Sequence, residues 1–118
     1  GRANFADAVI DTIDEGRAMV PLFGQVLRIP LRQELLKAGE QVTVMMRPEA
    51  IRLVRDPSLK QVKIEQVMYL GREVEYTITF DNHTWAVADT DPRAGRAFAE
   101  GETVGMTMVE DATHLLSP

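Results

Sequence analysis

The chain has 118 residues, 45% of them hydrophobic and 26% charged, which is typical of a folded protein with one domain or two small lobes that share a core. Its 13 basic and 18 acidic residues give a net charge of −5, which argues against a nucleic-acid-binding protein, because neutralising phosphates needs a basic face. It has no cysteine, which excludes disulfides and thiol catalysis, and no apolar run near the roughly 20 residues that span a bilayer, so we expect no membrane insertion.

Apolar and polar residues alternate with a period of two along most of the chain, and this pattern predicts an all-β protein of short strands. Pro21 cannot donate a backbone hydrogen bond, so we expect it at a sheet edge or a strand end. Two stretches, 31–37 and 93–99, could form short helical turns. The expected strands, in chain order, are 17–23, 25–30, 41–46, 51–54, 61–70, 73–80 and 103–108, followed by a last short strand after an acidic turn at 110–111.

The expected strand 41–46 ends in two consecutive apolar residues, Met45 and Met46. Because neighbouring side chains on a strand point to opposite faces, one of the two must leave the core face. We expect that methionine to offer a soft apolar contact to a partner. Met106 and Met108 keep the alternation of their own strand and are expected in the core.

Arg47-Pro48-Glu49 is the most distinctive local motif of the chain. Pro48 favours an extended Arg47 and fixes the first position of a helical turn, and Glu49 then lies near the positive end of that turn. The motif predicts either a rigid corner between two strands or a pair of charges, Arg47 and Glu49, presented to a partner surface. The residues alone leave both interpretations open.

The segment 61–70 changes the parity of its apolar residues. Val62 and Ile64 share one parity, and Val67 and Tyr69 take the other. One extra residue would restore the register, so we predict a β-bulge near Gln66. Bulges bend strands, and strongly bent strands are what a small barrel requires.

The segment 73–80 has an apolar residue at every even position and Glu or Thr at every odd position. Tyr76 and Phe80 therefore belong to the core face, and Trp85 follows across a hairpin loop at 81–83. An oligonucleotide-binding surface needs exposed aromatic side chains, so this pattern disfavours the alternative of a nucleic-acid binder.

The sequence holds no recognisable catalytic motif. The phosphate-binding pattern Gly-x-x-x-x-Gly-Lys and the dinucleotide fingerprint are both missing, and the chain has two histidines, His83 and His114, and two serines. The acidic turn before His114 could supply metal ligands, but a solvated turn explains it more simply. We predict no catalytic, cofactor-binding or metal-binding residue here, and no enzyme in this chain by itself.

Four short motifs follow one another from Gly1 to about Leu116. They are Gly-x-x-Asn at 1–4, an apolar strand with Arg-Pro-Glu at 44–53, Tyr-Leu-Gly at 69–71, and Gly-x-x-Val at 101–104 before the acidic turn. In this order they resemble the transport-associated OB (TOBE) domain, which follows the nucleotide-binding domain in many ABC importer ATPases. The Tyr-Leu-Gly element is most similar to the iron, polyamine and thiamine importer type.

The resemblance implies OB-like barrel pieces, and a boundary near Asp56 suggests two sub-lobes, about 1–56 and 57–118. It also implies a regulatory domain that forms a homodimer, contacts its own nucleotide-binding domain, acts on membrane permease subunits indirectly and lies in the cytoplasm at the inner face of the bacterial plasma membrane. ATP and Mg²⁺ would bind that other domain, which we expect upstream because the chain starts at Gly1 rather than Met.

The candidate residues follow from the motifs together with the resemblance. As interface or regulatory residues we select Met45, Met46, Arg47, Glu49 and Arg72. As structural residues we select Asn4, Pro48, Tyr69 and Gly71, with Asn4 and Gly71 expected in turns. A second hypothesis is a small-ligand sensor that binds an anion or the transported solute through Arg47, Arg72 and backbone N–H groups near Gly71.

Overall fold

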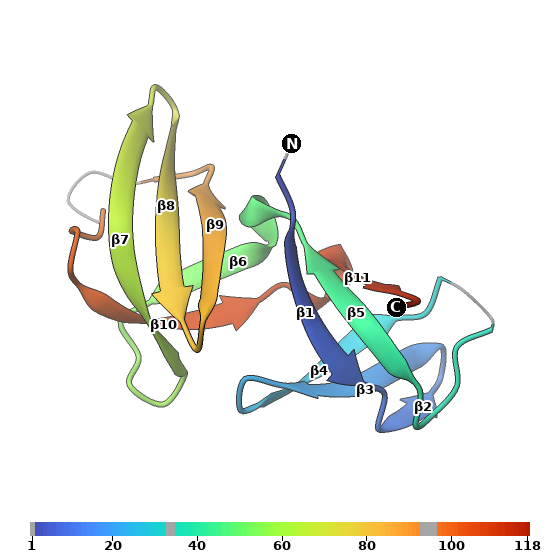
Figure 1. The fold of residues 1–118 in the computed structure, drawn as a ribbon. Coiled ribbons are helices and arrows are strands. Elements are labelled where there is room, and N and C mark those ends of the chain that lie inside the picture. Colours follow the sequence, from blue (N-terminus) through green and yellow to red (C-terminus); the bar gives the residue numbers. More distant parts are fainter. Residues whose placement is uncertain (1, 33–34, 93–96) are drawn as a thin grey trace.

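The computed structural model describes residues 2–32, 35–92 and 97–118, and these form eleven strands and two single turns of 3₁₀ helix (Figure 1). The prediction of an all-β fold is confirmed. The elements are β1 (Asn4–Val9), β2 (Thr12–Asp14), β3 (Arg17–Leu22), β4 (Gln25–Pro30), β5 (Gln41–Met46), η1 (Pro48–Ala50), β6 (Ile51–Val54), β7 (Lys60–Leu70), β8 (Glu73–Phe80), β9 (His83–Asp89), β10 (Thr103–Met108), η2 (Glu110–Ala112) and β11 (Thr113–Leu116).

The strands form three antiparallel sheets in two lobes (Figure 1). Lobe 1 contains the sheets β1-β5-β11 and β2-β3-β4, and lobe 2 is the single curled sheet β6-β10-β7-β8-β9. The strands do not divide at residue 56 as the sequence suggested. β6 already pairs with β10 in lobe 2, and the last strand, β11, returns to β5 in lobe 1. Each lobe is therefore completed by a segment distant in sequence.

The core follows the period-two pattern. Tyr76, Phe80 and Trp85 are buried, which confirms their assignment to the core, and so are Met106 and Met108. The buried side chains of both lobes belong to one continuous hydrophobic cluster.

Strand β7 contains the predicted bulge. Its pairing with β8 shifts between Ile64 and Gln66, so Glu65 is the extra residue. The β8–β9 hairpin turns on Asp81 and Asn82, both with positive φ (44° and 65°), as a type I′ turn requires. Pro21 lies near the end of β3, beyond the part that pairs with β2.

The two helical turns form elsewhere than at 31–37 and 93–99. η1 starts at Pro48, which confirms the turn expected from that proline, and η2 is the acidic turn. The described residues of 31–37 are not helical, because Leu36 enters the core and so short a segment cannot offset the cost of helix nucleation. Residues 93–96 lie outside the described ranges, and 97–99 are not helical. Within those ranges, no helix has the length and apolar character needed to cross a membrane.

Asn4 holds the two lobes together. Its buried amide donates to the carbonyl oxygen of Ala86 (2.8 Å) and accepts from the N–H of Ala86 (2.9 Å). One side chain of β1 thus satisfies both backbone groups at the outer edge of β9. Asn4 starts strand β1 and does not lie in the turn that the sequence suggested.

An aromatic cluster forms the second link between the lobes. Phe23, in the β3–β4 turn of lobe 1, packs edge-on against Phe80 and Trp85 of lobe 2, with ring centroids 4.9 and 5.5 Å apart. His83 stacks on Phe80 at 5.1 Å in the same cluster. These contacts give the lobes a shared apolar seam.

Candidate interaction surfaces

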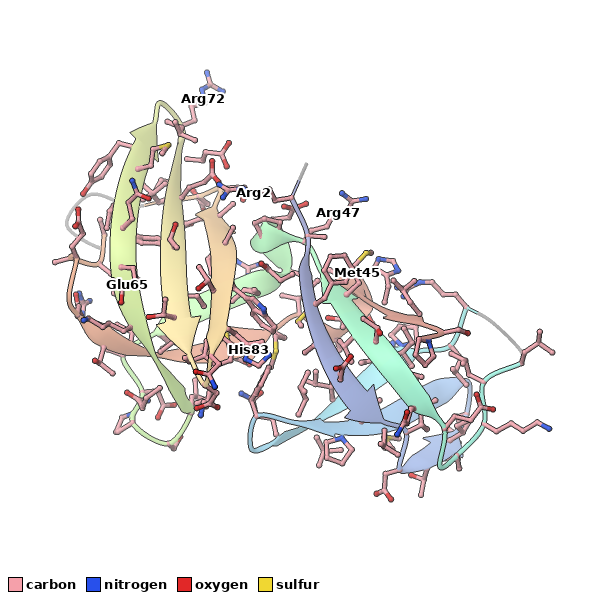
Figure 2. All side chains as sticks on the ribbon, viewed as in Figure 1. Arg2, Met45, Arg47, Glu65, Arg72 and His83 are labelled. Carbon is pink, nitrogen blue, oxygen red and sulfur yellow. The ribbon has the colours of Figure 1, made fainter. Side chains whose placement is uncertain are left out.

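The first candidate surface lies on the outer face of sheet β1-β5-β11. In the strand register, Met45 lies between Phe5 of β1 and His114 of β11. Phe5 is 50% exposed, and Met45 and His114 are half-buried. Arg47 follows at the end of β5, and Figure 2 shows Met45 and Arg47 on this part of lobe 1. We call these four residues, Phe5, Met45, Arg47 and His114, the β5 face.

The two consecutive methionines of β5 have different environments. Met46 is fully buried and belongs to the core, so it is not available to a partner in this fold. Met45 is the methionine that leaves the core face, as the break in alternation required. Of the two methionines, Met45 is therefore the one that remains a candidate contact residue.

Arg47 and Glu49 are both exposed at the corner that Pro48 forms. The backbone builds this corner: Arg47 is extended (φ −73°, ψ 157°) and its carbonyl oxygen accepts from the N–H of Ala50 at 2.9 Å. Among the described residues, neither charged side chain makes an ion pair. The motif is thus a rigid corner that leaves both charges free for a partner.

A basic cluster lies beside Met45. Arg32 donates to the carbonyl oxygens of Thr113 and Asp111, both at 2.8 Å, which places its guanidinium next to β11. Partial burial and the charges of Arg32 and Arg47 lower the pKa of His114. The depression there has a volume of about 260 Å³ and is lined by Arg32, Met45 and His114, among others. Arg32 is the charged side chain in this lining, and both ends of its guanidinium already donate to backbone carbonyl oxygens.

The second candidate surface is the upper half of β7. Met68, Tyr69 and Leu70 are 44%, 69% and 42% exposed, although all three side chains are large and apolar or aromatic. β10 pairs with β7 only over Lys60–Lys63, and in Figure 1 the β7–β8 hairpin extends well beyond β10. We call residues 66–70 the β7 edge.

Tyr69, selected as a structural residue, is thus a surface residue of this edge. It lies directly opposite Val74 at the end of the hairpin. Gly71 and Arg72 form the turn, and Gly71 has the left-handed φ of 65° that this turn needs and that glycine adopts without strain. Arg72 is exposed at the tip.

Arg47 and Arg72 do not form one site. Arg47 belongs to lobe 1, whereas Arg72 lies at the tip of the β7–β8 hairpin of lobe 2, and Figure 2 shows them well apart. The ligand site hypothesised from Arg47, Arg72 and the backbone N–H groups near Gly71 is therefore not assembled within one copy of the chain. Sequence reasoning missed Phe5, Arg32 and His114, because only strand pairing brings them beside Met45 and Arg47.

A small cavity opens between the two outer strands of lobe 2, β6 and β9. Its volume is about 170 Å³, and its lining includes Arg52, Tyr76, Asp89 and Phe98. The hydroxyl of Tyr76 accepts from the N–H of Phe98 at 3.1 Å, and burial raises the pKa of Tyr76. Typical small-molecule sites have about 300–1,000 Å³, so this cavity suits only a ligand of a few atoms. Within the described ranges, no three His, Asp or Glu residues come together as metal ligands.

Two import proteins align with nearly the whole chain. The spermidine/putrescine import ATP-binding protein PotA of Mesorhizobium japonicum is 25% identical over 118 residues, which cover 98% of this chain and 32% of the relative. The protein of the same name from Lawsonia intracellularis is 32% identical over 119 residues, which cover 91% of this chain and 31% of the relative. The chain thus spans about a third of the length of these relatives.

The fold has a solved counterpart. The cytoplasmic molybdate-binding protein ModG superposes with a TM-score of 0.72 at 15% identity, covering 98% of this chain and 96% of ModG. This likeness supports the OB-like β architecture. The TOBE domain family matches residues 44–116, which include the Arg-Pro-Glu corner, the bulged strand and the returning β11. This chain belongs to the TOBE domain family.

Proposed function

We propose that this chain is the regulatory domain of the ATP-binding subunit of an ABC importer. The observation that carries the proposal is the alignment of the whole domain with a third of two import ATP-binding proteins, together with the TOBE match. The domain performs no catalysis in this proposal, and ATP and Mg²⁺ bind a nucleotide-binding domain elsewhere in the parent protein. Both relatives are named for spermidine and putrescine import, so polyamines are the first cargo to test.

In this proposal the domain acts by binding other protein surfaces. Two copies associate as a homodimer in the cytoplasm, at the inner face of the bacterial plasma membrane, and each copy touches its own nucleotide-binding domain. The exposed charges of Arg47 and Glu49 on a rigid corner support such a docking role, because their orientation is set by the backbone before binding. The permease subunits are affected only through the nucleotide-binding domains.

Two measurements on the isolated chain test the proposal. Light scattering at micromolar concentration should give about twice the 13.2 kDa mass of one chain, and an ATPase assay should detect no turnover. Monomers at that concentration would contradict the dimer. ATP hydrolysis by the isolated chain would contradict the regulatory role.

A charge reversal tests the docking corner. In the full-length subunit, Glu49→Arg should change the coupling of ATP hydrolysis to transport and leave the melting temperature unchanged. Asp14→Arg, an equally exposed acid on β2, is the matched control and should change neither. If Glu49→Arg lowers only the melting temperature, the corner is purely structural.

A second candidate function, small-anion sensing, is favoured by the charges of Arg32, which lines the depression near Met45, and of Arg47, whose charge reaches His114 in the same depression. The fold likeness to a molybdate-binding protein makes oxyanions the first ligands to test. Calorimetry with molybdate, sulfate, phosphate and spermidine should then show heat with an oxyanion, and Arg47→Ala should abolish it. No heat with any of the four would remove this candidate.

A further inference from the structure

The β7 edge is an open strand edge: among the described residues, none forms a backbone hydrogen bond with it on the side that faces away from β8. The hairpin closes with the pair Leu70–Glu73, and hydrogen-bonded and non-hydrogen-bonded pairs alternate along an antiparallel ladder. The backbone N–H and C=O groups of Tyr69 and Val67 therefore point away from β8, to the open side. Nearer the start of β7 the same edge is paired. The carbonyl oxygen of Ile64 accepts from the N–H of Gly101 at 2.7 Å, and the N–H of Ile64 donates to the carbonyl oxygen of Glu102 at 2.9 Å.

An open edge of this kind favours pairing with another strand. Four of its five side chains are apolar or aromatic, and no residue from Gln66 to Leu70 is charged. Exposed edges of folded proteins usually carry charges or proline that prevent pairing, and this edge has neither. The bulge at Glu65 limits the available segment to about five residues.

The edge is complementary to a second copy of itself. A two-fold axis at Met68 brings Met68 against its own copy and Val67 against Tyr69 of the partner. Val67 and Tyr69 then form the hydrogen-bonded pairs through the backbone groups that β8 leaves free. The three central pairs of this register are apolar on apolar, and Gln66 faces Leu70 of the partner on either side of them.

The charges at the two ends of the segment agree with the same register. Arg72 at the hairpin tip and Glu65 at the bulge are both on the surface, at opposite ends of the segment (Figure 2). Within its own chain, Glu65 lies 3.8 Å from the ammonium of Lys63 and accepts from the hydroxyl of Thr79 at 3.0 Å. In an antiparallel pair centred on Met68, Arg72 of one copy approaches Glu65 of the other. Two such opposite-charge pairs flank the apolar centre, whereas a parallel pair would bring like charges together.

We propose that the β7 edges of two copies pair as antiparallel strands about a two-fold axis at Met68, giving a continuous β8-β7-β7-β8 sheet across the dimer. This inference rests on the homodimer of the proposed function and identifies the surface that forms it. The partner is a second copy of this chain, and the pairing adds main-chain hydrogen bonds to an apolar contact.

Single substitutions test the pairing by light scattering. Met68→Lys places two like charges on the axis and should weaken the dimer at least tenfold, while within one chain the new Lys faces Glu75 of β8 and keeps the fold. Val26→Lys is the matched control, because Val26 is 61% exposed on a strand of lobe 1. It should leave the dimer unchanged.

Crosslinking tests the register, since the native chain has no cysteine. A non-hydrogen-bonded pair has Cα atoms about 4.5 Å apart, within the range of a disulfide, so Met68→Cys should form a covalent dimer on mild oxidation. Tyr69→Cys and Val26→Cys should not, because their copies lie beyond disulfide reach. Equal crosslinking of Tyr69→Cys and Met68→Cys would overturn the register.

The outcomes separate this inference from the proposed function. A wild-type dimer that survives Met68→Lys and does not crosslink through Met68→Cys overturns the β7 pairing and leaves a dimer through another surface. A wild-type chain that is monomeric at micromolar concentration overturns the proposed dimer, and this pairing with it.

Discussion

Two of the strand edges in lobe 2, β9 and the upper half of β7, have opposite environments. At β9, the amide of Asn4 binds both backbone groups of Ala86, and the side chains beside it, Trp85 and Val87, are buried. At the β7 edge, no residue in the described part of the chain pairs with the backbone on the side away from β8, and Tyr69 is 69% exposed. The β9 edge therefore has its hydrogen-bond partner within the chain, whereas the β7 edge is accessible to water or to a partner.

The environment explains why the β9 edge had to be closed. Buried backbone groups without water need a protein partner, or the full cost of desolvation remains. Because β9 faces the seam between the lobes, water does not reach the backbone of Ala86. The amide of Asn4 makes the two hydrogen bonds that a neighbouring strand would otherwise make. The β7 edge is solvated in the single chain, so its free groups cost nothing until a second strand covers them.

The largest effect is expected from a substitution that removes the hydrogen bonds of Asn4 to the β9 edge. Asn4→Ala leaves the buried N–H and C=O of Ala86 without partners, and each such group costs roughly 1–3 kcal/mol, so we expect a loss of about 3 kcal/mol in the free energy of unfolding. Urea denaturation measures it. Asp7→Ala, an exposed change on the same strand, should stay within about 0.5 kcal/mol. A similar small loss for Asn4→Ala would show that water enters the seam.

A second change tests how tightly the other outer strand, β6, is held. A Cβ on Gly105 of β10 would lie 2.6 Å from the carbonyl oxygen of Asp56 and 2.9 Å from that of Val54. Gly105→Ala must therefore displace backbone, and we expect a loss of about 2 kcal/mol, within the range of overpacked cores. Thr103→Ala, exposed on the same strand, is the control for denaturation. An unchanged midpoint would mean that the chain after β6 moves easily.

A third change concerns the open edge. Tyr69→Thr removes a side chain that is mostly exposed in the single chain and keeps good strand propensity, so the unfolding free energy should change by less than about 0.5 kcal/mol. The dimer should dissociate about tenfold more readily, which corresponds to roughly 1.4 kcal/mol. Sedimentation at several concentrations measures it. A large loss of stability in the monomer would show that Tyr69 packs within its own chain.

The smallest expected effect is a pH dependence on the β5 face. The pKa of His114 is lowered in the fold by partial burial and by Arg32 and Arg47, so the unfolded chain binds the proton more readily. Stability should therefore decrease as the pH falls below the ordinary value of 6.5. Urea denaturation at pH 7.5 and 5.5 should show this loss in the wild type and a smaller one in His114→Gln. Equal losses in both would contradict this role for His114.

The pH range separates this effect from that of the carboxylates. Hydrogen bonds from Arg55 and from the N–H of Ala99 lower the pKa of Glu102, and Ser58 lowers that of Asp56. Stability from these groups is present above their ordinary pKa values of 4.5 and 3.8 and is lost only as the pH falls below them. At pH 5.5 both remain ionised.

Local features were predictable where adjacent residues determine them. The parity change in 61–70 located the bulge to within one residue, and Pro48 located a helical turn. Of the candidate residues, Met45 and Arg47 come together on one surface, whereas Met46 is buried and Arg72 belongs to the other lobe. Met46 shares the parity of Val42 and Val44, so the alternation of β5 favours Met46 for the core face, and the burial of these three residues agrees with it.

By itself, the sequence determined most of the strands and the turn at Pro48, since period-two alternation and proline act over a few residues, but β1 and β2 were not among the strands it predicted. Only the tertiary structure decided that β11 pairs with β5, that β6 joins lobe 2 and that Asn4 reaches Ala86. Those contacts join residues about 50 to 80 positions apart, and their partners are chosen by the burial of whole sheets, for which no local pattern codes.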